Sequence, residues 1–382
     1  MDLFSDDARH NPYPIYAQLR AAAPVFHEPQ SGLWMVFDYA GVRRALTEHE
    51  TFSSRHGPAD WMIFQDPPRH AQLRALVSRA FTPRSVANLE RRIDAIAREL
   101  LDRVAGRGAF DLAADFAVPL PMIVIAEMLG VPAEDRPRIA RWNDVLLRMS
   151  YLVADSPQAE DVFREFGVIT QGMSEYLAAL LAERRAQPKD DLLTRLGEAE
   201  VDGARLTHHD ILGFLQLLLL AGSETTTNLI NNAMLCFIEH PDQLALLRRR
   251  MDLLPSAIEE VLRFRAPLQW MFRLTTRDVE LHGQTLPAKT LLLAMIGSAN
   301  RDLAAFPDAE KFDITRDPNP HLAFGHGAHF CLGAPLARLE GRVALTALLE
   351  RFSTIELAES EPWEPRKGLH VHGPTRLPIN VG

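Results

Sequence analysis

The most constraining feature of this sequence is a glycine-rich loop that carries one of its only two cysteines. The loop reads Phe324-Gly325-His326-Gly327-Ala328-His329-Phe330-Cys331-Leu332-Gly333. A helix is predicted directly after it, because Pro335 suits a helix start and apolar residues then recur at helical spacing up to Leu348. Cys331 therefore precedes a helix N-terminus, where free N–H groups and the helix dipole favour a thiolate. Because glycines let the backbone approach a flat ligand closely, we expect Cys331 to be an axial ligand to iron.

Two simpler roles for cysteine compete with this one. A lone cysteine is often a small buried side chain, and Cys236, in an apolar stretch, fits that description. A zinc site is the other alternative, since His321, His326 and His329 lie close to Cys331 in the sequence. The spacing of these residues is poor for zinc, and the chain has no C-x-x-C pair.

Composition excludes several classes of protein. The net charge of −9 argues against nucleic acid as a partner, and two cysteines cannot build a disulfide framework. The first residues lack the basic and apolar stretches of a leader peptide, and the apolar run around Leu217–Gly222 is too short to span a bilayer. We therefore expect a cytoplasmic monomer without a membrane partner. No linker or repeat divides the 382 residues, so a single large domain over 1–382 is predicted.

Helix signals dominate the chain, and strand signals are few. Besides the helix after Cys331, we predict helices over 86–104, 121–129 and 207–240, with two or three more within 134–188. The predicted strands are a hairpin of Pro24–His27 with Trp34–Phe37, and the stretches Val279–His282, Leu291–Ala294 and Arg376–Val381. The fold class is therefore mainly α with a minor β portion.

The predicted helix over 207–240 changes character half-way along. Thr207 and Asp210 form a capping-box start, and Ile211–Ala221 is almost wholly apolar. Gly222 is then followed by six polar residues, Ser223–Asn228. A carboxylate and three threonines are costly inside a buried helix unless they are hydrogen-bonded, and we expect a local bend at Gly222. Alternatively, the polar stretch marks the place where the helix reaches solvent.

Both segments resemble motifs of the cytochrome P450 superfamily. The Cys331 loop matches its haem-binding loop, Phe-Gly-x-Gly-x-His-x-Cys-x-Gly, at every fixed position. Ala221-Gly222-x-Glu224-Thr225 resembles its oxygen-activation motif, Ala-Gly-x-(Asp/Glu)-Thr. The resemblance implies the cytochrome P450 fold, with haem b held between the long helix and the helix after Cys331.

The resemblance also implies roles for individual residues. Cys331 would bind the iron, and Thr225 and Glu224 would deliver protons during the activation of O₂. The haem would further contact Ala221, Phe324 and Gly325, and its propionates would be held by His70, Arg74, Arg273 and His329. The substrate pocket would include Trp61, Ile63, Leu268, Trp270 and Met271, together with helices around 140–175.

A third motif has an implied structural role. Glu260 and Arg263 share a helix face and resemble the family's Glu-x-x-Arg pair, which ties its helix to the segment before the cysteine. Arg316 is predicted to be the third member of this network.

The implied activity is that of a haem-thiolate monooxygenase that inserts one atom of O₂ into a hydrophobic molecule, by hydroxylation or epoxidation. Because no phosphate-binding glycine motif is found, electrons are expected from a ferredoxin and its reductase. The expected docking arginines are Arg69, Arg79, Arg84, Arg338 and Arg342. The alternatives are a peroxide-using, coupling or rearranging haem-thiolate enzyme, and a haem carrier or sensor without catalysis.

Overall fold

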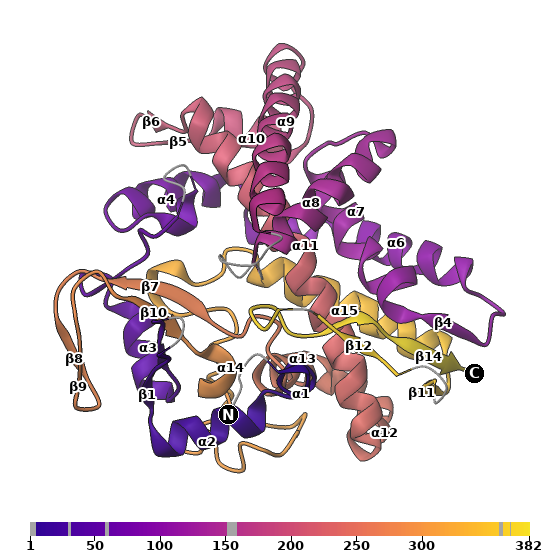
Figure 1. Ribbon diagram of the computed structural model, residues 1–382. Coiled ribbons are helices and arrows are strands. Elements are labelled where there is room, and N and C mark those ends of the chain that lie inside the picture. Colours follow the sequence, from indigo (N-terminus) through magenta and orange to yellow (C-terminus); the bar gives the residue numbers. More distant parts are fainter. Residues whose placement is uncertain (1–4, 30–31, 58–60, 151–158, 359–361, 367) are drawn as a thin grey trace.

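Helices make up most of the structure, as predicted. The computed structural model describes residues 1–382 except 1–4, 30–31, 58–60, 151–158, 359–361 and 367 (Figure 1). The α-helices are α1 Asp6–His10, α2 Tyr13–Ala22, α3 Tyr39–Thr47, α4 Arg69–Ala80, α5 Pro83–Ala87, α6 Glu90–Arg103, α7 Pro119–Met128, α8 Arg136–Ser150, α9 Ala159–Ala186, α10 Leu192–Glu198, α11 His208–Glu239, α12 Pro241–Arg249, α13 Leu254–Phe264, α14 Ile296–Ala299 and α15 Ala334–Arg351. Short helical turns are η1 Met62–Phe64, η2 Ala113–Ala117, η3 Ala133–Asp135, η4 Met251–Leu253 and η5 Gly327–His329.

A five-stranded sheet lies at one side of the helices, in the order β1-β2-β10-β7-β3. Its strands are β1 Val25–His27, β2 Trp34–Val36, β3 Phe52–Ser53, β7 Met271–Thr275 and β10 Leu291–Ala294. The remaining strands pair in small ribbons: β4 Ala109–Asp111, β5 Glu200–Val201, β6 Ala204–Arg205, β8 Val279–Leu281, β9 Gln284–Leu286, β11 Ile355–Leu357, β12 Glu364–Pro365, β13 Pro374–Arg376 and β14 Pro378–Val381. The predicted hairpin is confirmed, because β1 and β2 pair antiparallel from Val25 opposite Val36.

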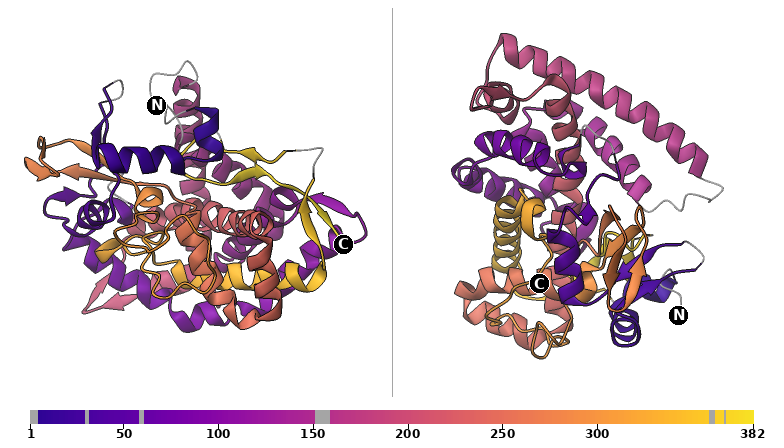
Figure 2. Two further views of the ribbon diagram at one scale, coloured as in Figure 1. Left: turned by 90° about the horizontal axis from the view of Figure 1, so that it is seen from below. Right: turned by 90° about the vertical axis from the view of Figure 1, so that its left-hand side faces the viewer.

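The long helix α11 runs through the centre of the molecule and packs against α7, α13 and α15 (Figures 1 and 2). Its start is the predicted capping box: Thr207 Oγ1 accepts from the Asp210 N–H, and the Asp210 carboxylate accepts from the Thr207 N–H. Gly222 permits close packing with α7, since a Cβ there would lie 2.8 Å from Cδ1 of Ile125. The expected bend does not interrupt α11, which is one continuous helix.

Two predicted element boundaries are wrong for local reasons. The helix predicted over 86–104 is two helices, because Thr82 and Ser85 form a capping box that starts the short α5, and α6 begins only at Glu90. The strand predicted over Arg376–Val381 is divided at Leu377 between β13 and β14.

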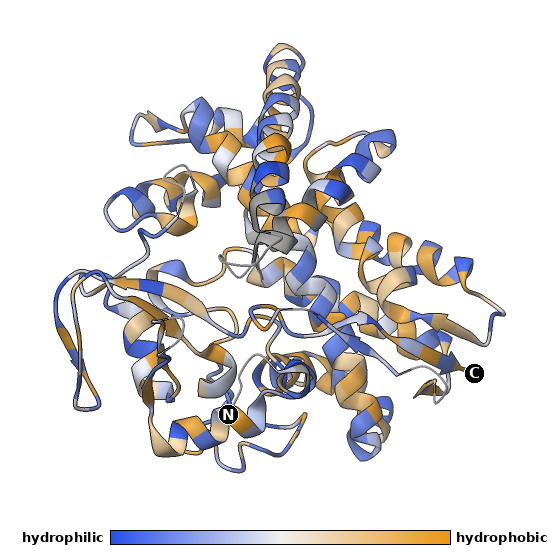
Figure 3. Cartoon of the chain, in the orientation of Figure 1, coloured by the Kyte–Doolittle hydropathy of each residue, from blue (hydrophilic) through white to orange (hydrophobic). Residues whose placement is uncertain are grey.

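Hydrophobic and hydrophilic residues alternate along the helices in Figure 3, as expected for helices with one buried side. The main core joins α6, α7, α11, α13 and α15. No helix in the described part of the chain is long and apolar enough to cross a bilayer.

Candidate active site

A largely apolar cavity separates α11 from the Cys331 loop. One wall is the face of α11 that carries Phe214, Leu217, Leu218, Ala221 and Thr225. The opposite wall is the segment from Ala323 to Gly333 with the first turn of α15. Since the Cys331 side chain is open to this cavity, the thiol sulfur and the middle of α11 face the same space.

The Cys331 loop is folded by its own backbone. The N–H of Cys331 donates to the carbonyl of Phe324 across 2.8 Å, and Gly325 and Gly327 have φ angles of 73° and 72°. Burial raises the pKa of the Cys331 thiol, although the N–H groups of Gly333 and Ala334 act to lower it. The N–H groups at the helix start thus favour the thiolate as expected, but in the protein alone desolvation is the stronger effect. A bound metal ion reverses this balance, since a coordinating thiol is deprotonated.

Glu259 ties the two ends of the Cys331 loop to α13. Its carboxylate accepts two hydrogen bonds of 2.7 Å from Arg338 on α15 and lies 3.0 Å from Nε2 of His321, which precedes the loop. Burial acts to raise the pKa of Glu259, but the bonds from Arg338 and His321 outweigh it and lower the pKa to about 2. The sequence analysis missed this residue, because its partners are far away in the sequence.

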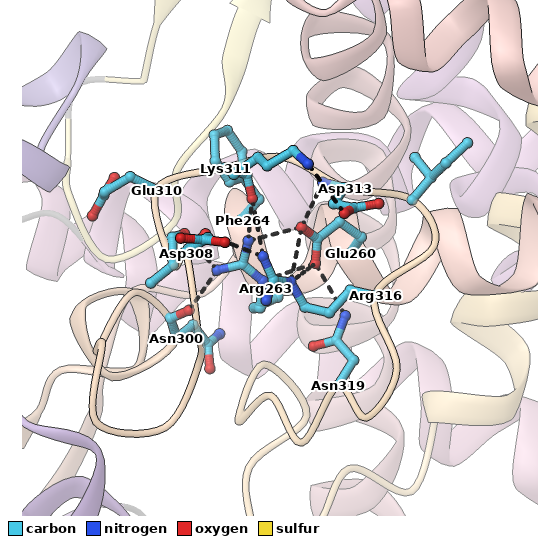
Figure 4. A network of polar contacts seen from close by, with 12 residues as sticks. Glu260, Arg263, Phe264, Asn300, Asp308, Glu310, Lys311, Asp313, Arg316 and Asn319 are labelled. Atoms are coloured by element: carbon cyan, nitrogen blue, oxygen red, sulfur yellow. Dashed lines mark hydrogen bonds and ion pairs between the residues drawn. The ribbon is translucent and has the colours of Figure 1, made fainter.

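A second network, next to it on α13, holds the segment before the loop (Figure 4). Glu260 and Arg263 are completely buried and joined by two bonds of 2.8 Å, and Arg316 lies 3.2 Å from Glu260. Arg263 also donates to the carbonyls of Asn300 and Ala309. The three-membered network predicted from the sequence is confirmed. Removing one partner of such a buried pair typically costs about 3–5 kcal/mol, because the other charge stays buried.

Basic side chains gather at one side of the cavity. His70 and Arg74 on α4, Arg273 on β7 and His329 all line it, and the rings of His70 and His329 are 3.9 Å apart. Burial first, then repulsion by neighbouring cations, lowers the pKa of His70 to about 4 and of His329 to about 3; burial lowers the pKa of Arg273 to about 10. Neither Arg74 nor Arg273 forms an ion pair with a described residue. The carboxylate of Asp66 acts on this cluster but pairs with Arg55, so Arg74 and Arg273 have no carboxylate of their own among the described residues. The cluster therefore fits a ligand that carries carboxylates, such as haem.

Thr225 and Glu224 point to different sides of α11. Thr225 lines the cavity, and its hydroxyl donates to the carbonyl of Ala221 across 2.8 Å. The Glu224 side chain is 4% exposed and lies outside the cavity wall, 2.5 Å from Nε of Arg366. The polar stretch is thus buried beside the cavity, and it does not mark the place where α11 meets solvent. Arg366 is a further residue that the sequence analysis missed.

The predicted substrate-pocket residues divide into two groups. Ile63, Leu268 and Met271 line the cavity. Trp61 does not, because its indole N–H donates to Gln216 of α11 and the ring is buried behind the wall. Trp270 also lies outside it, with its ring 5.3 Å from that of His370 and tilted by 32°. No described residue of α8 or α9 lines the cavity, and part of the 140–175 stretch lies outside the described residues.

The profile of the family named Cytochrome P450 matches residues 35–377. The chain belongs to the cytochrome P450 family. It is 42% identical to a putative cytochrome P450, YjiB, of Bacillus subtilis over 94% of this chain and 91% of that one. It is 40% identical to the vitamin D(3) 25-hydroxylase of Pseudonocardia autotrophica over 100% and 96%. A solved structure of a Bacillus megaterium P450, CYP109E1, in complex with testosterone superposes with a TM-score of 0.90 at 39% identity, over 97% of this chain and 99% of that one.

As a cytochrome P450, the protein is an oxidoreductase that uses a haem-thiolate cofactor and O₂. A zinc site needs at least three ligands close together. Among the described residues, no three His, Cys, Asp or Glu side chains are grouped so that they could hold a metal ion. His321 instead lies 3.0 Å from the carboxylate of Glu259.

The surface arginines of this P450 differ in their pairing. Arg69 pairs with Asp210, Arg342 with Glu90, and Arg338 with Glu259. Arg79 and Arg84 are exposed and have no ion pair with a described residue. Three of the five arginines expected to dock a partner are therefore already bound to acidic side chains.

Proposed function

We propose that this protein is a haem b monooxygenase that inserts one oxygen atom of O₂ into a hydrophobic small molecule, by hydroxylation or epoxidation. One observation carries the proposal: Cys331 and Thr225 line the same mostly apolar cavity, Cys331 from the glycine-rich loop and Thr225 from α11. This pairs a soft metal ligand with a proton-carrying group, on opposite sides of a space that takes a flat apolar ligand.

The residues around the cavity have separate tasks in this proposal. Cys331 binds the iron, Phe324, Gly325 and Ala221 contact the macrocycle, and His70, Arg74, Arg273 and His329 bind its carboxylates. When bound, the haem supplies the binding and reductive activation of O₂. Thr225 holds a proton at its hydroxyl, on the cavity side of α11, and Glu224 passes protons to it from the opposite side. The apolar walls exclude water and orient the substrate.

The substrate class follows from the apolar residues that line the cavity together with Thr225. Phe214, Leu217, Ile63, Leu268 and Met271 offer an apolar surface without a carboxylate. Such a surface fits a terpenoid, steroid, polyketide or fatty-acyl-like molecule. The names of two relatives, a vitamin D(3) hydroxylase and a testosterone complex, support the same class.

Electrons are proposed to come from a ferredoxin and its reductase. An acidic ferredoxin would approach the exposed Arg79 and Arg84, at the end of α4 and the start of α5, which packs against α15, the helix after the Cys331 loop. Such charges act mainly on the rate of association and its salt dependence.

The test compares wild type with Cys331→His. The reduced wild-type protein should give the red-shifted CO band of a thiolate-ligated haem, and the variant should bind haem without that band. With O₂ and electrons from a ferredoxin, wild type should convert a steroid or fatty-acid panel to products that carry one added oxygen. A red-shifted band that survives in Cys331→His would contradict the assignment. Turnover with hydrogen peroxide but never with O₂ would favour the peroxide-using alternative, and no turnover at all a carrier or sensor.

A further inference from the structure

The buried carboxylate of Glu224 has a cationic neighbour, Arg366, which comes 142 residues later in the sequence. Nε of Arg366 lies 2.5 Å from Oε1 of Glu224, and the two side chains are only 11% and 4% exposed. The Nε–H does not point along this line, so the contact is an ion pair and not a directed hydrogen bond. An ionised carboxylate is costly to bury unless a cation accompanies it, and Arg366 meets that need.

The C-terminal ribbon places Arg366 against α11. Arg366 follows β12 directly, and its N–H donates to the carbonyl of Gly373, just before β13. β13 packs against α11, and the yellow strands lie beside the helix in Figure 1. Gly373 lies so close to the helix that a Cβ would collide with the amide oxygen of Asn228. This close approach fixes the position along α11 at which the ribbon contacts the helix. It therefore also fixes the position of Arg366.

Asn228 lies against the same carboxylate oxygen of Glu224 as Arg366 does. Its Nδ2 donates to the backbone carbonyl of Glu224 across 2.9 Å and lies 3.5 Å from Oε1 of Glu224. The carboxylate is thus oriented away from the cavity, while Thr225, the next residue, faces into it. Glu224 has to leave this orientation, at least in part, to reach the hydroxyl of Thr225.

We propose that Arg366 is a positioning residue for Glu224, which keeps its carboxylate ionised and holds it on the side of α11 away from the cavity, one residue from Thr225, and so governs proton delivery. The inference rests on the proposed function. Glu224 takes a proton from a hydronium ion of the solvent, which leaves as water, and the neutral carboxyl group loses its attraction to Arg366. It then gives that proton to the hydroxyl oxygen of Thr225, while this hydroxyl passes its own proton to the O₂-derived oxygen that the proposed reaction reduces in the cavity. No electron moves, and the carboxylate returns to Arg366.

Turnover of the holoenzyme with Arg366→Gln, Arg366→Lys and Arg376→Gln tests this role. Arg376 is the matched control, because it lies on the same ribbon but pairs with Glu364 at the surface, 3.9 Å away. Arg366→Gln should lower kcat by about tenfold, below the roughly 10²–10⁴-fold of a direct proton-transfer group, and raise the solvent isotope effect, with KM unchanged. Arg366→Lys should restore most of kcat, and Arg376→Gln should equal wild type. Unchanged kcat and isotope effect in Arg366→Gln, or an equal loss in Arg376→Gln, would overturn the proposal.

A second measurement needs no turnover and separates this inference from the proposed function. Glu224→Gln, Arg366→Gln and the double variant are unfolded by heat, each as the haem-bound protein. If Arg366 and Glu224 interact, the sum of the Tm losses of the two single variants should be larger than the Tm loss of the double variant. Strictly additive losses would overturn the pairing even in an active enzyme. Non-additive losses in a protein without monooxygenase activity would support the Arg366–Glu224 pair and contradict the proposed monooxygenase function.

Discussion

At the scale of single residues, Glu340 of α15 is a buried carboxyl group that couples the stability of the fold to pH. It is fully buried, and neither carboxylate oxygen has a hydrogen-bond partner among the described residues. Burial raises its pKa from 4.5 to about 8. The folded state therefore favours the protonated form, and the group destabilises the fold increasingly as the pH rises from about 4.5 to 8. At pH 7 this amounts to about 3 kcal/mol.

Glu340→Gln should therefore stabilise the protein, and more at pH 8 than at pH 5. The free energy of unfolding in urea at the two pH values measures the effect. Glu350→Gln, at the exposed end of the same helix, is the control and should change little at either pH. A gain of equal size at pH 5 and pH 8 would contradict the prediction, since only a titrating group gives a pH-dependent gain.

Thr225 is the residue on which proton delivery depends. Thr225→Ala should uncouple the enzyme, so that electrons appear as hydrogen peroxide and product formation falls by about 10²–10⁴-fold. The ratio of product to electrons consumed gives the readout, and Thr225→Ser, which keeps the hydroxyl, should stay near wild type. Wild-type coupling in the alanine variant would show that Thr225 is only a helix residue or that Thr226, which also lines the cavity, replaces it.

At the scale of elements, α13 connects the Cys331 loop to the rest of the fold. Glu259 binds both Arg338 of α15 and His321 ahead of the loop, and its pKa is lowered from 4.5 to about 2. A lowered pKa means stability that is present above about pH 4.5 and is lost as the pH falls towards 2. The contribution is roughly 2–3 kcal/mol at neutral pH, and about 1 kcal/mol of it is lost by pH 4.

Glu259→Gln should consequently lower the free energy of unfolding at pH 7, and the deficit should shrink at pH 4. Urea unfolding at the two pH values provides the comparison. Glu48→Gln removes an exposed pair with Arg44 on α3 and should cost less than about 1 kcal/mol. A deficit that stays constant between pH 7 and pH 4 would mean that the side chain packs without acting as a charge.

Local signals in the sequence were sufficient for most elements and for the residues that face the cavity. The capping box at Thr207, the glycines around Cys331 and the Glu260–Arg263 spacing all act within one turn or loop, so they can be identified without a tertiary structure. Arg366 and Trp61 could not be placed in this way. The role of Arg366 depends on a partner across the molecule, and the orientation of Trp61 depends on Gln216, to which its indole donates.

At the scale of the whole molecule, net charge and local charge have opposite effects on a redox partner. The chain carries −9, which repels an acidic ferredoxin, whereas Arg79 and Arg84 are exposed cations without an ion pair among the described residues. Arg338 is less suitable for this role than the sequence indicated, because it is bound to Glu259 and its guanidinium lies 4.5 Å from the ring centre of Phe324.

Arg79→Glu with Arg84→Glu should slow reduction by an acidic ferredoxin at low salt, by roughly tenfold or more. The difference should vanish at high salt, and binding of substrate should not change. Stopped-flow reduction under CO at several salt concentrations gives the rates. Arg164→Glu with Arg185→Glu makes the same charge change on α9 and is the control. If both pairs of substitutions slow reduction equally, the effect comes from the net charge of the protein, and Arg79 and Arg84 do not form a docking face.

The cavity wall is assembled from both halves of the chain, beginning at Leu46 and ending at Ala337. During synthesis the helices before α11 emerge first, and the cysteine comes only near the end. A growing chain thus exposes an incomplete apolar cavity wall, and it cannot bind iron through Cys331 until translation is almost complete. The cofactor therefore has to bind after the polypeptide is complete. A chain that terminates before Cys331 would leave the ribosome with its apolar cavity wall exposed, and chaperones and proteases would act on it.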